Sequence, residues 1–217
     1  MNNPNFETMR AAMVASQLRT TGVSDPAVVE AMSAVPREQF VPESRRAVAY
    51  ADIATPVAAG RALLPPMVLG QLLTEALVKP GEKALVVGGT TGYAAAVLAE
   101  MGLGTVLLES DKSLSAETPK ALKGRVTQVA GELEKGHAKG APYDLILIDG
   151  AVEVIPQALI DQLADGGRLI AVKIGEDGIG RAVIGHKAGS AFGLRDFADA
   201  PAAERLPGFA RPRGFTF

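Results

Sequence analysis

One short stretch constrains the fold more than any other part of the chain. Residues 83–87 form an apolar, β-branched run, the turn Gly88-Gly89-Thr90-Thr91-Gly92 follows directly, and residues 93–101 have the composition of a helix. A strand, a glycine turn and a helix start place backbone N–H groups at a helix N-terminus, where a ligand can approach the main chain closely. The sequence therefore predicts a ligand-binding strand–turn–helix unit.

A second apolar run, residues 104–109, ends in the carboxylate of Glu109. An acid about 20 residues beyond such a turn commonly accepts hydrogen bonds from the hydroxyls of a ribose. Gly88, Gly92 and Glu109 thus outline a nucleoside-cofactor site, although a solvated acid at a strand end is the alternative for Glu109. Thr90 stands where the tightest form of the turn has glycine, so its side chain either fills the space of the ligand or demands a φ that threonine resists.

Buried apolar runs alternate with helical segments along the rest of the chain. This alternation indicates βαβ units, right-handed crossovers and a doubly wound parallel sheet of the α/β class. The end of the chain differs, because it is expected to form a hairpin and then a Pro/Gly-rich tail that ends in an apolar strand. The expected strands are 83–88, 104–109, 125–130, 143–149 and 168–173, the helices 92–101, 112–122 and 155–163, the hairpin 179–188 and 190–197, and the tail 206–217.

The N-terminal part has another character. Phe6, Met9, Met13 and Leu18 have helical spacing, and a second helix is expected to begin after a cap at Ser24 or Asp25 and to end near Pro36. Residues 36–66 contain five prolines and few periodic runs, so they are expected to form an ordered loop region that folds over something. A further helix is expected over 67–77. We divide the chain into a helical and proline-rich cover segment, 1–66, and one compact domain, 67–217.

Composition excludes several classes of function. The formal charge of −2 and the absence of a basic run argue against a nucleic-acid partner. The chain has no cysteine, which excludes disulfides and thiolate chemistry, and two histidines, His137 and His186, are too few for an imidazole metal site. No apolar run is long enough for a membrane span, and the first residues are polar, so we expect a cytoplasmic protein without a membrane partner. The sequence leaves the oligomeric state open.

Several segments together resemble the protein-L-isoaspartate O-methyltransferase family. Their order along roughly residues 9–175 is more specific than any single glycine motif, and the short tail 206–217 looks like the divergent, mainly bacterial branch of that family. The segments are Met13-Val14-Ala15-Ser16-Gln17-Leu18, Val35-Pro36-Arg37-Glu38-Gln39-Phe40-Val41-Pro42, Ala49-Tyr50, residues 88–98, Ala141-Pro142-Tyr143-Asp144, Ile155-Pro156 and residues 162–169.

The resemblance implies a class I methyltransferase: a doubly wound, mostly parallel seven-stranded Rossmann-like sheet with an N-terminal helical and loop extension. It implies S-adenosylmethionine as cofactor and S-adenosylhomocysteine as product. Family members methylate the α-carboxyl of an isoaspartyl residue in a protein or peptide, which leads to repair of the damaged linkage through a succinimide. Carried over by position, the cofactor-binding residues are Gly88, Gly89, Thr90, Gly92, Glu109 and Glu132, the last in place of the acid that holds the adenine edge.

The chain departs from the family pattern at several site positions. Hydroxyl residues expected near the substrate carboxylate, an acid late in the first strand and two glycines are replaced. Each lost hydrogen bond to a charged group is worth about 1.5–3 kcal/mol, so these changes predict weaker cofactor binding. The replacing residues are Ala62, Leu64, Val86, Thr90 and Leu133.

Two residues are candidates for direct catalytic or substrate contacts. Asp149 ends the strand at 143–149, where many class I methyltransferases hold catalytic groups and where catechol-type enzymes bind a divalent metal; an exposed or helix-capping acid is the alternative. Arg37, like Tyr50, lies in the proline-rich cover and is expected either to contact a peptide or carboxylate or to be structural. No metal is assigned.

Three functions remain open from the sequence. The first is methyl transfer to isoaspartyl residues. The second is a catalytically impaired paralogue that keeps the fold and acts as a binding protein. The departures from the family pattern at Thr90, Leu64 and Leu133 favour this second function. The third is methyl transfer to a small carboxylate or hydroxyl compound with the help of Asp149.

Overall fold

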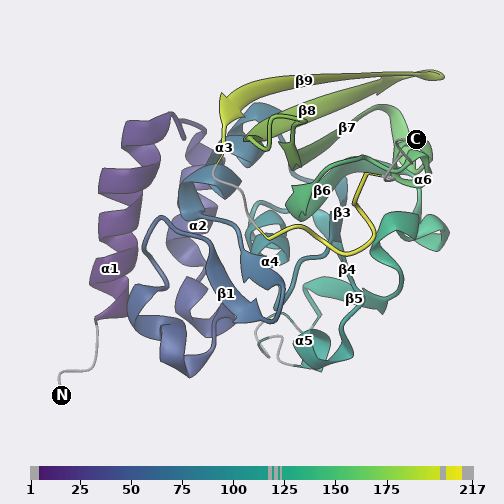
Figure 1. The fold of residues 1–217 in the computed structure, drawn as a ribbon. Coiled ribbons are helices and arrows are strands. Elements are labelled where there is room, and N and C mark those ends of the chain that lie inside the picture. The colour runs from purple at the N-terminus through teal and green to yellow at the C-terminus, as the bar shows by residue number, and fades with distance from the viewer. Residues whose placement is uncertain (1–4, 117–118, 120–121, 123, 201–203, 212–217) are drawn as a thin grey trace.

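A computed structural model describes residues 5–116, 119, 122, 124–200 and 204–211 of the 217-residue chain. Its main feature is a sheet of seven strands, within these described residues, in the order β5-β4-β3-β6-β7-β8-β9 (Figure 1). The first five are parallel, and β8 and β9 form an antiparallel hairpin at one edge. The strands are β3 (Lys83–Val87), β4 (Gly104–Glu109), β5 (Val126–Ala130), β6 (Tyr143–Val152), β7 (Leu163–Ile174), β8 (Gly180–Ala188) and β9 (Ala191–Asp199). The alternation of strands and helices predicts the parallel part of this sheet, and the resemblance implies the seven-stranded class I methyltransferase arrangement as a whole.

The strand order reverses next to β3. From β3 the chain moves outward to β4 and β5 and then returns to β6, which pairs with the other side of β3 through Ala84–Leu145 to Val87–Ile148. In doubly wound sheets the crevice at such a reversal, outside the carboxyl ends of the strands, is where ligands bind. The carboxyl ends of β3, β4 and β6 therefore mark the region in which a site is expected.

At the centre of the sheet β3 and β6 are buried on both faces, which is why they are nearly continuous apolar runs. Ala84 and Val86 of β3 belong to one apolar cluster, and Leu85 and Val87 belong to the other. The first cluster includes residues of α3 (Pro66–Ala76) and α4 (Tyr93–Glu100), and the second includes Leu159 of α6 (Gln157–Asp161). Successive side chains of a strand point to opposite faces, so the two clusters lie on opposite sides of the sheet.

The N-terminal helices form as expected and share the first cluster with the sheet. The chain begins with α1 (Phe6–Met13), continues in a π-helical turn, Val14–Leu18, and reaches α2 (Pro26–Ala34). Asp25, rather than Ser24, is the cap of α2: its Oδ1 accepts hydrogen bonds from the N–H groups of Ala27 and Val28 at 2.8 and 3.4 Å. α1 and α2 lie together on one flank of the molecule (Figure 1, purple and blue).

The proline-rich region is ordered, as expected, but it also holds a small hairpin that the sequence does not reveal. Two 3-10 helices, Arg37–Phe40 and Glu43–Val48, are followed by β1 (Thr55–Ala58) and β2 (Arg61–Leu63), which pair antiparallel. β2 is too short for periodicity to identify, and each of its three residues is buried. This hairpin carries Arg61 to the carboxyl ends of β3 and β4.

The remaining differences concern the ends of elements. α5 covers Lys112–Ala116, and residues 117–118, 120–121 and 123 of the expected helix 112–122 lie outside the described residues. β6 continues beyond the expected end at 149, because Ala151 and Val152 pair with Val172 and Lys173 of β7. Residues 212–217, where an apolar strand was expected, also lie outside the described part.

The C-terminal segment, residues 204–211, occupies a position that the sequence does not predict. Ala151 donates to Glu204 O at 3.2 Å, Leu206 donates to Ala151 O at 2.9 Å, and Glu153 and Val154 both donate to Phe209 O. β3 stops at Val87, so beyond that point the C-terminal segment takes its place beside β6 (Figure 1, yellow). A segment of the chain itself thereby lies at the reversal of strand order.

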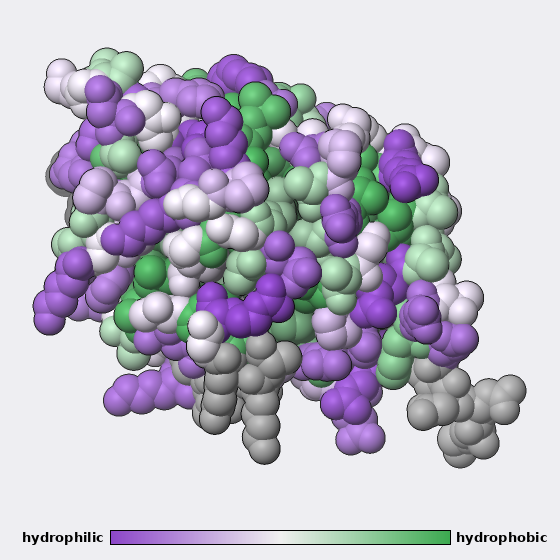
Figure 2. All heavy atoms as spheres, turned by 180° about the vertical axis from the view of Figure 1, so that it is seen from behind, coloured by the Kyte–Doolittle hydropathy of each residue, from purple (hydrophilic) through white to green (hydrophobic). Residues whose placement is uncertain are grey.

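On the face seen in Figure 2, polar side chains are interspersed with small apolar areas. In the described part of the chain, no helix combines the length and apolar character needed to cross a bilayer.

Candidate functional site: the carboxyl ends of β3, β4 and β6

The glycine turn has the backbone that the sequence predicts, including at its odd residue. Gly88 and Gly92 have φ of 73° and 98°, and Thr90 has φ of 52°. Gly89 lies so close to the sheet that an added Cβ would meet Leu107 Cδ1 at 2.4 Å. A β-branched residue rarely adopts a positive φ, so Thr90 keeps a glycine-type backbone under strain, and its buried Oγ1 has no hydrogen-bond partner among the described residues.

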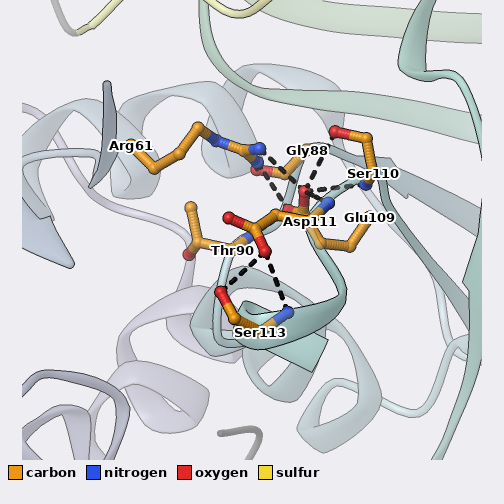
Figure 3. A network of polar contacts seen from close by, with 7 residues as sticks. All are labelled: Arg61, Gly88, Thr90, Glu109, Ser110, Asp111 and Ser113. Atoms are coloured by element: carbon orange, nitrogen blue, oxygen red, sulfur yellow. Dashed lines mark hydrogen bonds and ion pairs between the residues drawn. The ribbon is translucent and has the colours of Figure 1, made fainter. Parts of the chain in front are cut away.

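Glu109 lies beside this turn, as predicted, and its carboxylate is fully engaged (Figure 3). Three backbone N–H groups donate to it: Thr90 N at 3.0 Å, Ser110 N at 2.8 Å and Asp111 N at 2.9 Å. The side chain is buried, with 0% of its surface exposed. Glu109 thus ties the end of β4 to the turn after β3.

The remaining positions on Glu109 are taken by Arg61, which the sequence analysis did not select. Arg61 Nη1 donates to Oε1 at 2.7 Å and Nη2 donates to Oε2 at 2.5 Å, and Nη2 also donates to Gly88 O at 2.9 Å (Figure 3). The arginine side chain is 5% exposed. The available signal was a single cation directly before the apolar run Ala62-Leu63-Leu64, which suggests that Arg61 has a buried partner but does not identify that partner.

Leu206 of the C-terminal segment closes the same region from the side of β6. A Cβ added at Gly88 would lie 2.8 Å from Leu206 Cδ1, and one added at Gly150 would lie 2.6 Å from Leu206 Cγ. Leu206 itself is 3% exposed. Its side chain therefore packs directly on the turn after β3 and on the strand that contains Asp149.

These contacts decide whether an adenosyl cofactor fits the arrangement described here. An ionised carboxylate offers about four lone-pair positions, and six donors already converge on Glu109. The hydroxyls of a ribose have no acceptor site there while Arg61 stays in place, and Leu206 covers Gly88. In this conformation the residues do not fit the cofactor.

Glu132, the residue predicted to hold the adenine edge, forms its ion pair away from Glu109 and Arg61. Its carboxylate pairs with Lys135 at 2.7 Å, and both side chains are exposed. The neighbouring Leu133 is buried in the second apolar cluster, so its side chain serves the core. Val86, where the family has an acid, is likewise buried in the first cluster.

Asp149 is a buried acid at the site. It is 2% exposed, and burial raises its pKa to about 7, although the positive charges of Arg37 and Arg61 oppose the shift. The negative charge of Glu109 raises the pKa further. Asp149 is therefore an acid that changes charge near neutral pH, beside two arginines.

Arg37 is buried and anchors the cover segment. Its Nε donates to Ala49 O and its Nη2 to Leu64 O, each at 2.8 Å, and its guanidinium lies 4.7 Å from the centre of the Tyr93 ring. Burial lowers its pKa from the ordinary value. Nη1 has no hydrogen-bond partner in the part of the chain that is described. Leu64, where the family has a hydroxyl, contributes its carbonyl here, while its side chain is buried.

The structure also places the remaining polar candidates, Tyr50, His137 and His186. The Tyr50 hydroxyl donates to Glu38, and burial raises the Tyr50 pKa. His137 lies in a loop, where its N–H donates to Gln162 Oε1 at 2.7 Å, and His186 is exposed on β8. Across the described ranges, no group of three His, Cys, Asp or Glu side chains is placed to hold a metal ion.

Comparison with known proteins shows which family the chain resembles. The sequence model of the family "Protein-L-isoaspartate(D-aspartate) O-methyltransferase (PCMT)" matches residues 9–189. A protein-L-isoaspartate O-methyltransferase 2 of Marinobacter nauticus is 41% identical over 179 residues, which are 80% of this chain and 81% of the relative. The protein-L-isoaspartate O-methyltransferase of Methylorubrum populi is 38% identical over 175 residues, 79% of this chain and 82% of the relative.

Two solved structures share the fold. A protein-L-isoaspartate O-methyltransferase has a TM-score of 0.79 at 21% identity, over 94% of this chain and 66% of that longer one. A putative protein-L-isoaspartate O-methyltransferase from Plasmodium falciparum, in complex with S-adenosyl-L-homocysteine, has a TM-score of 0.75 at 18% identity, over 93% of this chain and 98% of that one. The family match covers the glycine turn, Glu109, Asp149 and the cover segment alike, and the chain belongs to the protein-L-isoaspartate(D-aspartate) O-methyltransferase family.

Proposed function

We propose that the protein is an S-adenosylmethionine-dependent O-methyltransferase that esterifies the α-carboxylate of isoaspartyl residues in proteins or peptides. It would act in the cytoplasm in the repair of damaged proteins. The observation that carries this proposal is the family match over residues 9–189, together with relatives about two-fifths identical over four-fifths of the chain. Residues 1–66 would form the cover of the site, and residues 67–217 the domain that carries it.

The roles of individual residues follow from the site. Gly88, Gly89, Thr90 and Gly92 would contact the cofactor through the main chain, and Glu109 would hold its ribose once that carboxylate is free of Arg61. Glu132 would have to turn away from Lys135 to reach the adenine. When bound, S-adenosylmethionine would supply the methyl group, and S-adenosylhomocysteine would be the product.

Asp149 and Arg37 are the proposed contacts of the substrate carboxylate. With a pKa of about 7, Asp149 is partly protonated at neutral pH, so it can donate a hydrogen bond to an incoming carboxylate. Arg37 Nη1 is a donor without a partner in the described region. A carboxylate nucleophile is already ionised, so positioning by these groups is the main requirement for methyl transfer.

A second function is favoured by one observation, the buried pair of Arg61 and Glu109. If that pair never opens, the protein keeps the fold and acts as a binding protein without cofactor. The third candidate, methylation of a small carboxylate or hydroxyl compound, would use the same Asp149.

Radiolabelled methyl transfer distinguishes these functions. The purified protein is incubated with methyl-labelled S-adenosylmethionine and either an isoaspartyl peptide or its aspartyl twin, and base-labile methyl esters are counted. Label above the aspartyl control is expected, with a large loss in Asp149→Ala, which removes the hydrogen-bond donor. Equal label on both peptides contradicts the proposal, and transfer to small carboxylates alone favours the third candidate.

A further inference from the structure

We propose that the protein carries its own occupant of the cofactor site, an internal plug consisting of Arg61 and Leu206, which any cofactor must displace. This inference rests on the proposed function, because it concerns the same site. The two plug residues come from elements far apart in the chain, the β1–β2 hairpin and the C-terminal segment, and they meet at Gly88.

Arg61 occupies the polar half of the site. It gives Glu109 the two donors that the paired hydroxyls of a ribose would give, and it also holds the carbonyl of Gly88. An arginine fork matches a carboxylate in two parallel bonds, so it competes with a diol for the same oxygens. The carboxylate cannot hold both at once.

Leu206 occupies the apolar half. It packs on Gly88, directly after β3, and on Gly150 of β6, and a Cβ at either glycine would clash with it. Its backbone is held beside β6 by the bond from Leu206 N to Ala151 O and by the bond from Ala151 N to Glu204 O. The segment therefore pairs with β6 through a single β-bridge, in the position where a ligand of a doubly wound sheet binds.

The closed arrangement leaves polar groups unsatisfied at the site. Arg61 Nε and Thr90 Oγ1 are both buried without a hydrogen-bond partner in the described part of the chain. Glu109, by contrast, keeps three backbone donors when Arg61 is removed from it. The carboxylate is thus stabilised with or without the arginine, which is what an exchangeable occupant requires.

The test is S-adenosylhomocysteine binding by calorimetry to the wild type, Arg61→Met and Leu206→Ala. Methionine keeps most of the buried stem of the arginine but removes the donors. The apparent affinity of a closed protein is reduced by the fraction that is open, so we expect the Arg61→Met protein to bind at least tenfold more tightly.

Arg168→Met is the matched control. Arg168 forms a similar pair with Glu82 at 2.6 Å, but at the amino-terminal ends of the strands, where its Nε also donates to Ala76 O and its Nη1 to Asp144 O. This variant loses an arginine–glutamate pair of the same kind away from the site. Its affinity for S-adenosylhomocysteine is expected to equal that of the wild type.

A second readout follows the C-terminal segment directly. Hydrogen exchange at the amides of Ala151 and Leu206 is expected to become faster in wild type saturated with S-adenosylhomocysteine, because their bonds break when the segment leaves. Slower exchange at both amides overturns the displacement.

The outcomes separate this inference from the proposed function. If the wild type binds S-adenosylhomocysteine and neither Arg61→Met nor Leu206→Ala binds it more tightly, the proposal of an internal plug is contradicted and the cofactor assignment stands. If a plug variant binds and the wild type does not, the plug is supported and the wild type is held closed. If no protein binds, both are overturned. Should Arg61→Met fail to fold by circular dichroism, Leu206→Ala is judged by the same tenfold criterion.

Discussion

At the scale of single residues, Asp149 links the chemistry of the site to the stability of the protein. In the unfolded chain its carboxyl has an ordinary pKa near 3.8, whereas in the folded protein burial raises that pKa to about 7. Between these values the folded state binds a proton that the unfolded state releases, so the free energy of unfolding falls as the pH rises. Below pH 4 and above pH 7 this contribution becomes constant.

The Asp149→Asn variant should remove this pH dependence, because the amide does not titrate. We expect the variant to gain about 2 kcal/mol of unfolding free energy relative to wild type between pH 5 and pH 7, close to the limit of about 1.4 kcal/mol per pH unit for one proton. Urea unfolding of both proteins at the two pH values measures the change. If the difference in unfolding free energy between variant and wild type is the same at pH 5 and pH 7, Asp149 is already ionised in the folded protein at pH 5.

Arg37 should prove more important for stability than any exposed arginine. Arg37→Met leaves the carbonyls of Ala49 and Leu64 buried and unpaired, and it is expected to lower the free energy of unfolding by about 2–4 kcal/mol. Urea denaturation gives the value. Arg125→Met, which removes the partly exposed pair with Glu100, is the control and should change stability by about 0.5 kcal/mol or less.

Sequence reasoning found some of the residues at the site and missed others for a physical reason. Gly88, Gly92 and Glu109 can be predicted because a strand, a turn and the next strand end are local features with fixed spacing. Arg61 lies 48 residues before Glu109, and Leu206 reaches Gly88 from near the other end of the chain. No periodicity or motif encodes contacts of that kind; they depend on the assembled fold.

At the scale of elements, helix α2 shows how local chemistry sets a boundary. The sequence allows either Ser24 or Asp25 as its cap, and the structure places the Asp25 carboxylate on the first N–H groups of the helix. The five core strands could be predicted because buried runs alternate with helices. β1, β2 and the position of residues 204–211 beside β6 could not, because these segments are short and depend on partners far along the chain.

Substitution at the cap tests this boundary. Asp25→Ala is expected to lower the free energy of unfolding by about 1 kcal/mol, the usual cost of losing an N-cap. Ser24→Ala, whose side chain is the rejected alternative, should stay within about 0.5 kcal/mol of wild type. Thermal or urea unfolding of the two variants distinguishes them, and equal losses would contradict the assignment of the cap.

At the scale of the whole molecule, the cover segment and the sheet share one apolar cluster. Met13, Leu18 and Met32 belong to the same cluster as Leu145 and Ile170. Parts that bury one common core unfold together, so the division at residue 66 describes position along the chain rather than separate stability.

The three tyrosines report on this cooperativity, since Tyr50 lies in the cover, Tyr93 in α4 and Tyr143 in β6. With fluorinated tyrosine, the three native fluorine resonances should disappear at one urea concentration. A lower midpoint for Tyr50 alone would show that the cover segment unfolds first.

The position of the C-terminal segment beside β6 also has a consequence during synthesis. The ribosome synthesises β3, β4 and β6 before residues 204–211. For a time, therefore, Leu206 does not yet cover the crevice of the nascent sheet. A nucleoside in the surrounding solution meets this crevice before the chain's own leucine does. During synthesis the ligand can therefore enter this crevice without displacing Leu206, whereas in the finished protein it must displace that side chain.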